Sequence, residues 1–337
     1  MQGDTITLSY GNMINKFQNR KKISMIKRAL FKLLKPYIQV FKKHLGVDEE
    51  KIRIFTGQAT VIASKSAHSK YKNLSDASFS IFSQWGEDGI LDYLCDVLDI
   101  ARPKVLELGA GNFHECNSRF LAEFRSADVV PVDAREDLIS SVSKLSVYWK
   151  NHIYPIQTWI TPESIKTIQA TANEKIGFFN ILSLDLDGND YWVAKEIDYS
   201  NVEIIVVEYN PIFGHKRAIT ILENENFDRT EAHYTWDYYG ASLLAWVNLF
   251  QSHNFSFIGS NLQGTNAFFI KTNNTSKLNF LISNDYEMYV NCPTRDARDK
   301  EGKMSYRSFA QRKQDIYGLE VFDLISSKRL ILTDQTH

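Results

Sequence analysis

The chain lacks the features that mark secreted, membrane-spanning and zinc-knuckle proteins. Its 337 residues contain three cysteines, Cys95, Cys116 and Cys292, which lie far apart and form no Cys-x-x-Cys pair, so neither a disulfide framework nor a zinc knuckle is expected. No uninterrupted apolar run approaches the roughly 20 residues that a transmembrane helix needs. The first residues also lack the apolar core of a signal peptide. These absences favour a protein of a reducing, cytoplasmic compartment.

Acidic residues are missing from one long stretch. Residues 5–47 contain ten of the 39 Lys and Arg residues and no Asp or Glu, so the other 29 basic residues face 40 acidic ones. Within residues 17–45, apolar side chains recur at helical spacing among the basic ones. We therefore expect residues 1–48 to form a basic amphipathic helical arm. Such an arm either contacts an anionic surface such as the inner membrane face, or packs on protein, including a second copy of the chain. No nucleic-acid partner is expected.

Strand-like and helix-like runs alternate regularly between residues 80 and 273. Five β/α units are predicted, with strands over residues 104–108, 129–132, 153–160, 179–186 and 202–207. Two more strands, over residues 255–259 and 267–271, have a connection too short for a crossover helix and must be antiparallel. This pattern predicts an α/β fold with a mostly parallel, Rossmann-like sheet of seven strands, the architecture of class I methyltransferases that use S-adenosylmethionine (SAM).

Flanking segments complete the predicted organisation. Residues 49–79 are expected to be an irregular linker or lid between the arm and the 80–273 domain. Residues 274–337 are expected to be a C-terminal extension that covers the domain with a polar loop and a terminal helix.

A glycine turn follows the first predicted strand. Gly109 and Gly111 would let a ligand approach the backbone closely, because a Cβ atom would obstruct it. A dinucleotide site prefers a third glycine, but His114 stands there, which favours SAM. Glu107 is expected to accept a hydrogen bond from the amino group of SAM. Asp133 follows Gly111 by 22 residues, a spacing that suits the ribose hydroxyls.

Adenine is expected beside the end of the third strand, at Thr158 and Trp159, although Trp159 would also suit a core position. The full set of residues predicted to bind SAM is Gln84, Glu107, Gly109, Gly111, Asn112, Asp133, Ala134, Thr158, Trp159 and Asp185.

Carboxylates gather where the fourth and fifth strands end. Asp185 and Asp187 lie on one side of the chain by alternation, and Glu208 and Asn210 end the next strand. Oxygen donors at one sheet edge suggest either a divalent cation, Mg²⁺ or Mn²⁺, at Asp187, Glu208 and Asn210, or direct binding of sugar hydroxyls. Asp187 could also serve the turn alone.

Three side chains are candidates for the general base of a methyl transfer to a hydroxyl group. They are Asp187, His215 and His233, of which the two histidines lie in the long polar segment after the fifth strand.

Six short motifs together resemble those of one known family. They are Ser83-Gln84-x-Gly86-Glu87-Asp88, Glu107-x-Gly109-x-Gly111, Asp185-x-Asp187-Gly188-x-Asp190, Glu208-Tyr209-Asn210, Tyr239-Gly240-Ala241-Ser242 and Gly264-x-Asn266-Ala267-Phe268-Phe269. Over residues 80 to about 272 the chain resembles the FkbM-like SAM-dependent methyltransferases, especially bacterial members associated with surface-polysaccharide gene clusters.

The resemblance implies an O-methyltransferase whose acceptor is a sugar hydroxyl or related group of a capsule or lipopolysaccharide precursor, such as a nucleotide sugar or glycan. One departure concerns catalysis. Where the family pattern Asp-x-Glu-Gly has Glu, this chain has Asp187, whose carboxylate reaches less far. Two alternatives stay open. One is a nicotinamide-dependent oxidoreductase, and the other is a non-catalytic glycan- or membrane-binding module with a vestigial SAM pocket.

Overall fold

The computed structural model describes residues 49–290, 292–294 and 297–334. The chain divides into two compact units, Met1–Thr56 and Gly57–His337. The predicted basic arm, with its possible membrane or self-association surface at residues 17–45, lies outside the described residues. Helix α2 (Glu49–Lys65) and the 3₁₀ helices η1 (His68–Lys70) and η2 (Leu74–Ala77) replace the irregular conformation expected after it. In the described ranges, no helix is both long enough and apolar enough to cross a bilayer.

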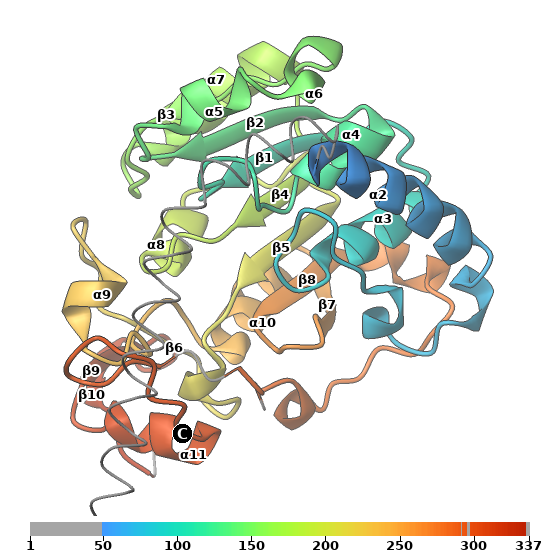
Figure 1. Cartoon of the computed structure of the whole chain (residues 1–337). Coiled ribbons are helices and arrows are strands. Elements are labelled where there is room, and N and C mark those ends of the chain that lie inside the picture. Colours follow the sequence, from blue (N-terminus) through green and yellow to red (C-terminus); the bar gives the residue numbers. More distant parts are fainter. Residues whose placement is uncertain (1–48, 291, 295–296, 335–337) are drawn as a thin grey trace, which may run out of the picture. The chain divides into compact units, whose positions relative to one another are not determined.

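A seven-stranded sheet forms the centre of the second unit (Figure 1). Its order is β3-β2-β1-β4-β5-β8-β7. The first five strands run parallel, and β8 runs antiparallel between β5 and β7. The strands are β1 (Lys104–Leu108), β2 (Asp128–Asp133), β3 (Ile156–Gln157), β4 (Ile181–Leu184), β5 (Ile204–Glu208), β7 (Phe255–Ser260) and β8 (Asn266–Lys271). The order and the closing hairpin confirm the predicted Rossmann-like methyltransferase fold.

The strand order also locates the ligand crevice. The chain proceeds from β1 outward to β3, then returns to β4 on the other side of β1. In open α/β sheets, ligands bind beyond the carboxyl ends of the strands at such a reversal. The turns after β1 and β4 are therefore the first place to look for a site.

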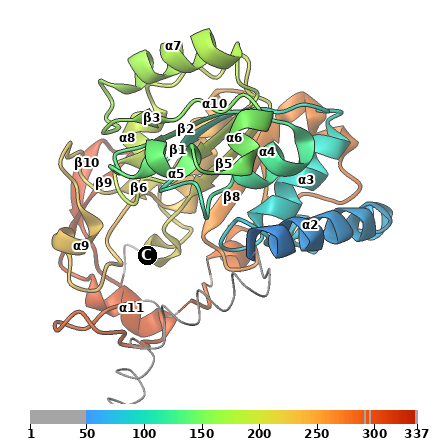
Figure 2. The same ribbon diagram turned by 45° about the horizontal axis from the view of Figure 1, so that its top comes forward.

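Helices cover both faces of the sheet. They are α3 (Glu87–Val97), α4 (Arg119–Arg125), α5 (Leu138–Val142), α6 (Ser146–Lys150), α7 (Ile165–Ile176), α8 (Asp190–Ala194) and α10 (Leu243–Ser252). Leu106 and Leu108 join the core formed with α7, α8 and α10. Alternation turns Glu107 to the opposite face, beside the start of α4. Figure 2 shows α7 separated from α4, α5 and α6 by the strands.

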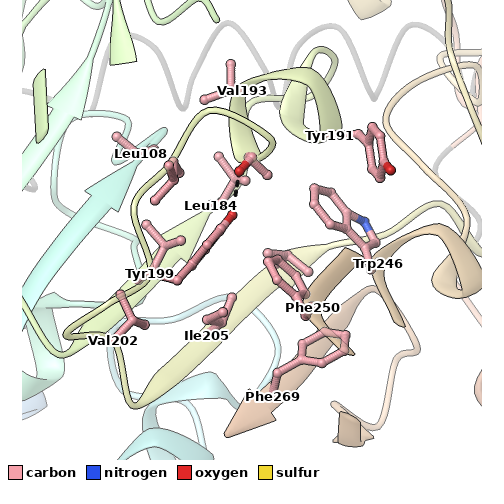
Figure 3. Close-up of a cluster of buried hydrophobic side chains, with 14 of the residues drawn as sticks. Leu108, Leu184, Tyr191, Val193, Tyr199, Val202, Ile205, Trp246, Phe250 and Phe269 are labelled. Atoms are coloured by element: carbon pink, nitrogen blue, oxygen red, sulfur yellow. Dashed lines mark hydrogen bonds between the residues drawn. The ribbon is translucent and has the colours of Figure 1, made fainter. Parts of the chain in front are cut away.

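Aromatic side chains fill the core on the α10 face (Figure 3). The rings of Trp246 and Phe250 stack with their centroids 5.5 Å apart, and Phe250 meets Phe269 of β8 edge-on at 4.8 Å. The buried hydroxyl of Tyr199 donates to the carbonyl of Ala194 at 2.6 Å, so its polar atom has a partner. Burying each such ring stabilises the fold by about 1.5–3 kcal/mol.

The polar segment after β5 and the C-terminal segment form one small sheet together. Strand β9 (Glu320–Asp323) pairs with both β6 (Ile219–Thr220) and β10 (Lys328–Ile331). The helix predicted for the C-terminal extension is present as α11 (Phe309–Asp315), but its terminal position is wrong, because β9 and β10 follow it. The remaining helices are η3 (Pro211–Phe213), α9 (Arg229–Ala232), η4 (Thr272–Lys277) and η5 (Tyr286–Tyr289).

A separate apolar cluster supports this small sheet. It joins residues from both segments, among them Phe213, Ile219, Ile316 and Val321. A sequence pattern cannot show this pairing, because roughly a hundred residues separate β6 from β9.

Candidate active site

A cavity of about 360 Å³ opens beyond the carboxyl ends of β1, β2 and β4. Seven of its lining residues were predicted from sequence: Gly109, Gly111, Asp133, Ala134, Trp159, Asp185 and Asp187. Six were not: Arg135, Ile160, Leu186, Asn189, Glu225 and Phe227. The strand ends thus bring the predicted turn and one of the predicted bases into a single cavity.

The two glycines of the turn serve different purposes. Gly109 has φ +89°, and a Cβ atom there would overlap the carbonyl oxygen of Asp185. Gly111 has φ +56°, and a Cβ atom there would meet no other atom within 4 Å. Gly109 therefore allows the turn to pack against the end of β4, whereas Gly111 leaves open space in the cavity.

Asp133 ties the glycine turn to the end of β2. Its Oδ2 accepts the N–H of Gly111 at 2.7 Å, and its Oδ1 accepts the N–H of Arg135 at 2.9 Å. A carboxylate has about four lone-pair positions, so Asp133 can still accept hydrogen bonds from a ligand. Its place in the lining suits the predicted contact with ribose hydroxyls.

Trp159 forms an aromatic wall of the cavity. Its side chain is 54% exposed, and its ring N–H donates to the carbonyl of Glu225 at 2.8 Å. The alternative core position for Trp159 is therefore wrong. The neighbouring Thr158 donates its backbone N–H to the carbonyl of Asp133 at 3.0 Å and is not part of the lining. Ile160, Leu186 and Phe227 add apolar surface that suits a flat ring.

Besides Thr158, three residues predicted to bind SAM lie outside the lining, and Glu107 is the most instructive. Its carboxylate accepts the N–H groups of Asn117 at 2.7 Å and Ser118 at 3.2 Å, and the hydroxyl of Ser118. The side chain is 3% exposed, and burial raises its pKa. Glu107 positions the segment before α4, which corrects the expectation of direct ligand contact. Gln84 is exposed, and Asn112 accepts the N–H of His114.

Glu87 and Asp88, from the same motif as Gln84, also act within the fold. Glu87 accepts the side-chain N–H groups of Asn261 at 2.7 Å and Asn266 at 2.8 Å, which links α3 to the closing hairpin. Asp88 accepts three consecutive backbone N–H groups, those of residues 81–83. Two motifs that are far apart in sequence therefore meet through one buried carboxylate.

Asp185, Asp187 and Glu208 form a carboxylate cluster. Each offers an oxygen atom within 4.8 Å of the others. Burial raises the pKa of both Asp185 and Glu208, and nearby carboxylates add to the effect. The cluster differs from the predicted cation site in one member, because Asp185 takes the place of Asn210.

Asn210 is a structural residue. Its side chain is fully buried, its Oδ1 accepts the N–H of Ile212 at 2.9 Å, and its Nδ2 donates to the carbonyls of Asp237 and Tyr239. Its prediction as a cation ligand is wrong, since the amide oxygen already holds the start of η3.

Comparisons with known proteins find similarity in solved structures. No family model and no curated protein matches the chain. A putative caffeoyl-CoA O-methyltransferase from Staphylococcus aureus has a TM-score of 0.38 and 12% identity, covering 71% of this chain and 99% of that one. The Methanococcus jannaschii fibrillarin pre-rRNA processing protein has a TM-score of 0.33 and 10% identity, covering 51% and 67%.

An O-methyltransferase family protein from Burkholderia thailandensis has a TM-score of 0.32 and 9% identity, covering 55% of this chain. This chain spans 57% of the length of that protein. Similarity at this level does not transfer an activity, which has to come from the residues of the cavity.

Arg229, which the sequence reasoning missed, holds the exposed member of the carboxylate cluster. Its Nη1 pairs with Asp187, its Nε donates to the carbonyl of Trp236, and its guanidinium lies 3.8 Å from the centre of the Tyr239 ring. Asp187 and Arg229 are 42 residues apart, so no local pattern links them. The pair gives Asp187 a fixed direction at the edge of the cavity.

Both candidate histidines lie away from the cavity lining. His233 is half-buried, its Nδ1 lies 2.8 Å from the hydroxyl of Thr235, and burial lowers its pKa. His215 is half-buried and lies in the loop after η3. Of the three predicted bases, Asp187 alone is placed to meet a ligand in this cavity.

Proposed function

We propose that this chain is a SAM-dependent O-methyltransferase whose acceptor is a sugar hydroxyl, or a related group, of a bacterial surface-polysaccharide precursor. One observation carries the proposal: the cavity at the sheet reversal has open space at Gly111 directly beside Asp133. Its volume of about 360 Å³ lies within the range of small-molecule sites. A Cβ atom at Gly111 would enter that space, so the turn suits a bound nucleoside.

The start of α4 disfavours the nicotinamide alternative. A dinucleotide site places a pyrophosphate on the first N–H groups of the helix after the turn. Here the carboxylate of Glu107 accepts the N–H groups just before α4. A second anion would be repelled there, whereas the cationic sulfonium of SAM needs no such anion site.

The residues of the cavity suggest how an acceptor hydroxyl is activated. When bound, SAM supplies an electrophilic methyl group. Asp187 would accept the proton that the acceptor hydroxyl releases, and Arg229 would hold that carboxylate in position. Asp133 and Trp159 would fix the cofactor end of the cavity, so that binding supplies the alignment of the reacting groups.

Carboxylate and amide oxygens support a sugar as acceptor. Asp185, Asp187 and Asn189 all line the cavity and suit a ligand with several hydroxyl groups. The assignment to capsule or lipopolysaccharide rests on the FkbM-like resemblance. The proposed setting is the cytoplasm, where residues 17–45 would contact the inner membrane face or a second copy.

A divalent cation is an optional part of the proposal. Asp185, Asp187 and Glu208 offer the oxygen donors that Mg²⁺ and Mn²⁺ prefer. Arg229 already offsets part of their charge. Binding of Mn²⁺ would be followed by electron paramagnetic resonance in the wild type and in Glu208→Gln. If the Mn²⁺ signal did not change when the protein was added, the cation would no longer be part of the proposal.

Calorimetric titration with S-adenosylhomocysteine tests the proposed function. The wild type is expected to bind, and Asp133→Ala is expected to bind about 10- to 100-fold more weakly, because it loses hydrogen bonds to a charged group. Glu163→Gln, at an exposed carboxylate outside the cavity, is the control. No binding by the wild type would refute the proposal. Stabilisation by NAD or NADP instead, in a thermal-shift panel, would favour the oxidoreductase.

A further inference from the structure

We propose that a second cavity, walled by Tyr234, Arg298 and Lys300, binds the anionic part of the acceptor, a sugar that carries a phosphate or a carboxylate. The cavity has a volume of about 450 Å³ and also includes Met304 and Arg307. The inference rests on the proposed function, since it assigns this cavity to the same acceptor.

Basic groups in this cavity lie over aromatic rings. The ammonium of Lys300 lies 5.7 Å from the centre of the Tyr234 ring, and the guanidinium of Arg298 lies 4.4 Å from that of Trp236. Tyr234 is 37% exposed. Aromatic rings offer an apolar face to the C–H groups of a sugar, while guanidinium and ammonium groups pair with phosphate or carboxylate. The combination favours an anionic sugar over a neutral one.

Two acidic residues share the lining, and one of them serves the local turn. Asp299 Oδ1 accepts the N–H groups of Glu301 at 3.0 Å and Lys303 at 2.9 Å. Arg298 and Met304 bridge the two sides of this turn. Asp299 therefore shapes the loop that carries Lys300. Arg307 donates to Asp315 of α11 at 2.7 Å, which ties the chain after the loop to that helix.

Trp236 connects this cavity with the first one. Its ring lies under Arg298 of the second cavity, while its carbonyl accepts from Arg229, the partner of Asp187 in the first cavity. Trp236 also has φ +63°, a left-handed conformation that is rare for a bulky residue and is often found at functional sites. Trp236 and Arg229 thus link the linings of the two cavities through direct contacts, and the proposal places the anionic group of the acceptor in the second cavity and its reacting hydroxyl in the first.

Binding of three probes to the full chain tests the proposal, with and without saturating S-adenosylhomocysteine. UDP-glucose carries phosphate, methyl β-D-glucuronide carries a carboxylate, and methyl β-D-glucoside is neutral. At least one anionic probe is expected to bind more tightly than the neutral one, and to bind more weakly in high salt. Lys300→Ala is expected to weaken that binding about fivefold, the effect of one charged contact near a surface. Tyr234→Ala is expected to weaken it about fivefold as well, because the sugar loses the apolar face of the ring.

Lys328→Ala, at an exposed lysine of β10, is the matched control and should bind like the wild type. The anionic probe that binds more tightly shows whether the cavity recognises phosphate or carboxylate. The proposal would be overturned if all three probes bound equally or if none bound. It would also be overturned if both cavity variants kept the wild-type affinity. Affinity for S-adenosylhomocysteine is a separate measurement. Its absence in the wild type would refute the methyltransferase function, while selective anion binding would still support the second cavity.

Discussion

Replacing each glycine of the turn by alanine separates folding from ligand binding. Gly109→Ala would force a side chain into a backbone with φ +89° and into the carbonyl oxygen of Asp185. A left-handed conformation costs a non-glycine residue about 1–2 kcal/mol, and overpacking a rigid contact costs about 1–3 kcal/mol more. Because the obstructing atom belongs to the backbone of the β4 turn and cannot rotate away, we expect both costs, a loss of about 2–5 kcal/mol in the free energy of unfolding.

Gly111→Ala should behave differently. Its φ of +56° is the left-handed conformation that alanine tolerates at a cost of about 1–2 kcal/mol. No neighbouring atom lies within 4 Å of the added methyl group, which would instead enter the cavity. We therefore expect a variant that loses only about 1–2 kcal/mol in the free energy of unfolding but binds S-adenosylhomocysteine poorly.

Urea unfolding followed by circular dichroism, together with calorimetric titration, measures both effects. Gly109→Ala is expected to be clearly less stable than Gly111→Ala. Equal stability of the two variants would show that the β4 turn yields to a side chain at Gly109. Wild-type affinity in Gly111→Ala would show that the glycine turn does not face the ligand.

Three further perturbations test other parts of the structure. Burial raises the pKa of Asp88 to about 7 from 3.8, so between these two values the folded state keeps a proton that the unfolded chain releases. The contribution of Asp88 to the free energy of unfolding is therefore fully present below pH ~4, and it falls on the order of 4 kcal/mol as the pH rises through 7. Urea titrations at several pH values should show this decline in the wild type and not in Asp88→Asn. Arg312→Met leaves the carboxylate of Asp237 charged in a site where both side chains are at most 3% exposed, and should cost about 3–5 kcal/mol, partly restored by adding Asp237→Asn. Trp159→Ala should weaken S-adenosylhomocysteine binding about tenfold through lost ring contact, while Trp149→Ala, at a 77% exposed position outside the cavity, should leave it unchanged.

Local patterns predicted much of the fold and part of the site. The strand at Lys104–Leu108 has the predicted bounds, and the closing strand pair is antiparallel as predicted. Short stretches suffice here because an apolar run, a glycine turn and a connection length are all local properties. Gly109, Gly111 and Asp133 reach the cavity because strand ends in a parallel sheet share one edge.

Tertiary packing decided which polar side chains face the ligand. Glu107 and Asn210 have the residue types of ligand contacts, yet each is buried and satisfied by backbone groups. Arg229 and Glu225 come from a segment without a helix or strand pattern, yet Glu225 lines the cavity and Arg229 pairs with Asp187 of its lining. The sequence by itself determined the succession of strands along the chain and the place of the turn. Only the tertiary structure decided which way each polar group points, since that depends on partners that lie tens of residues away.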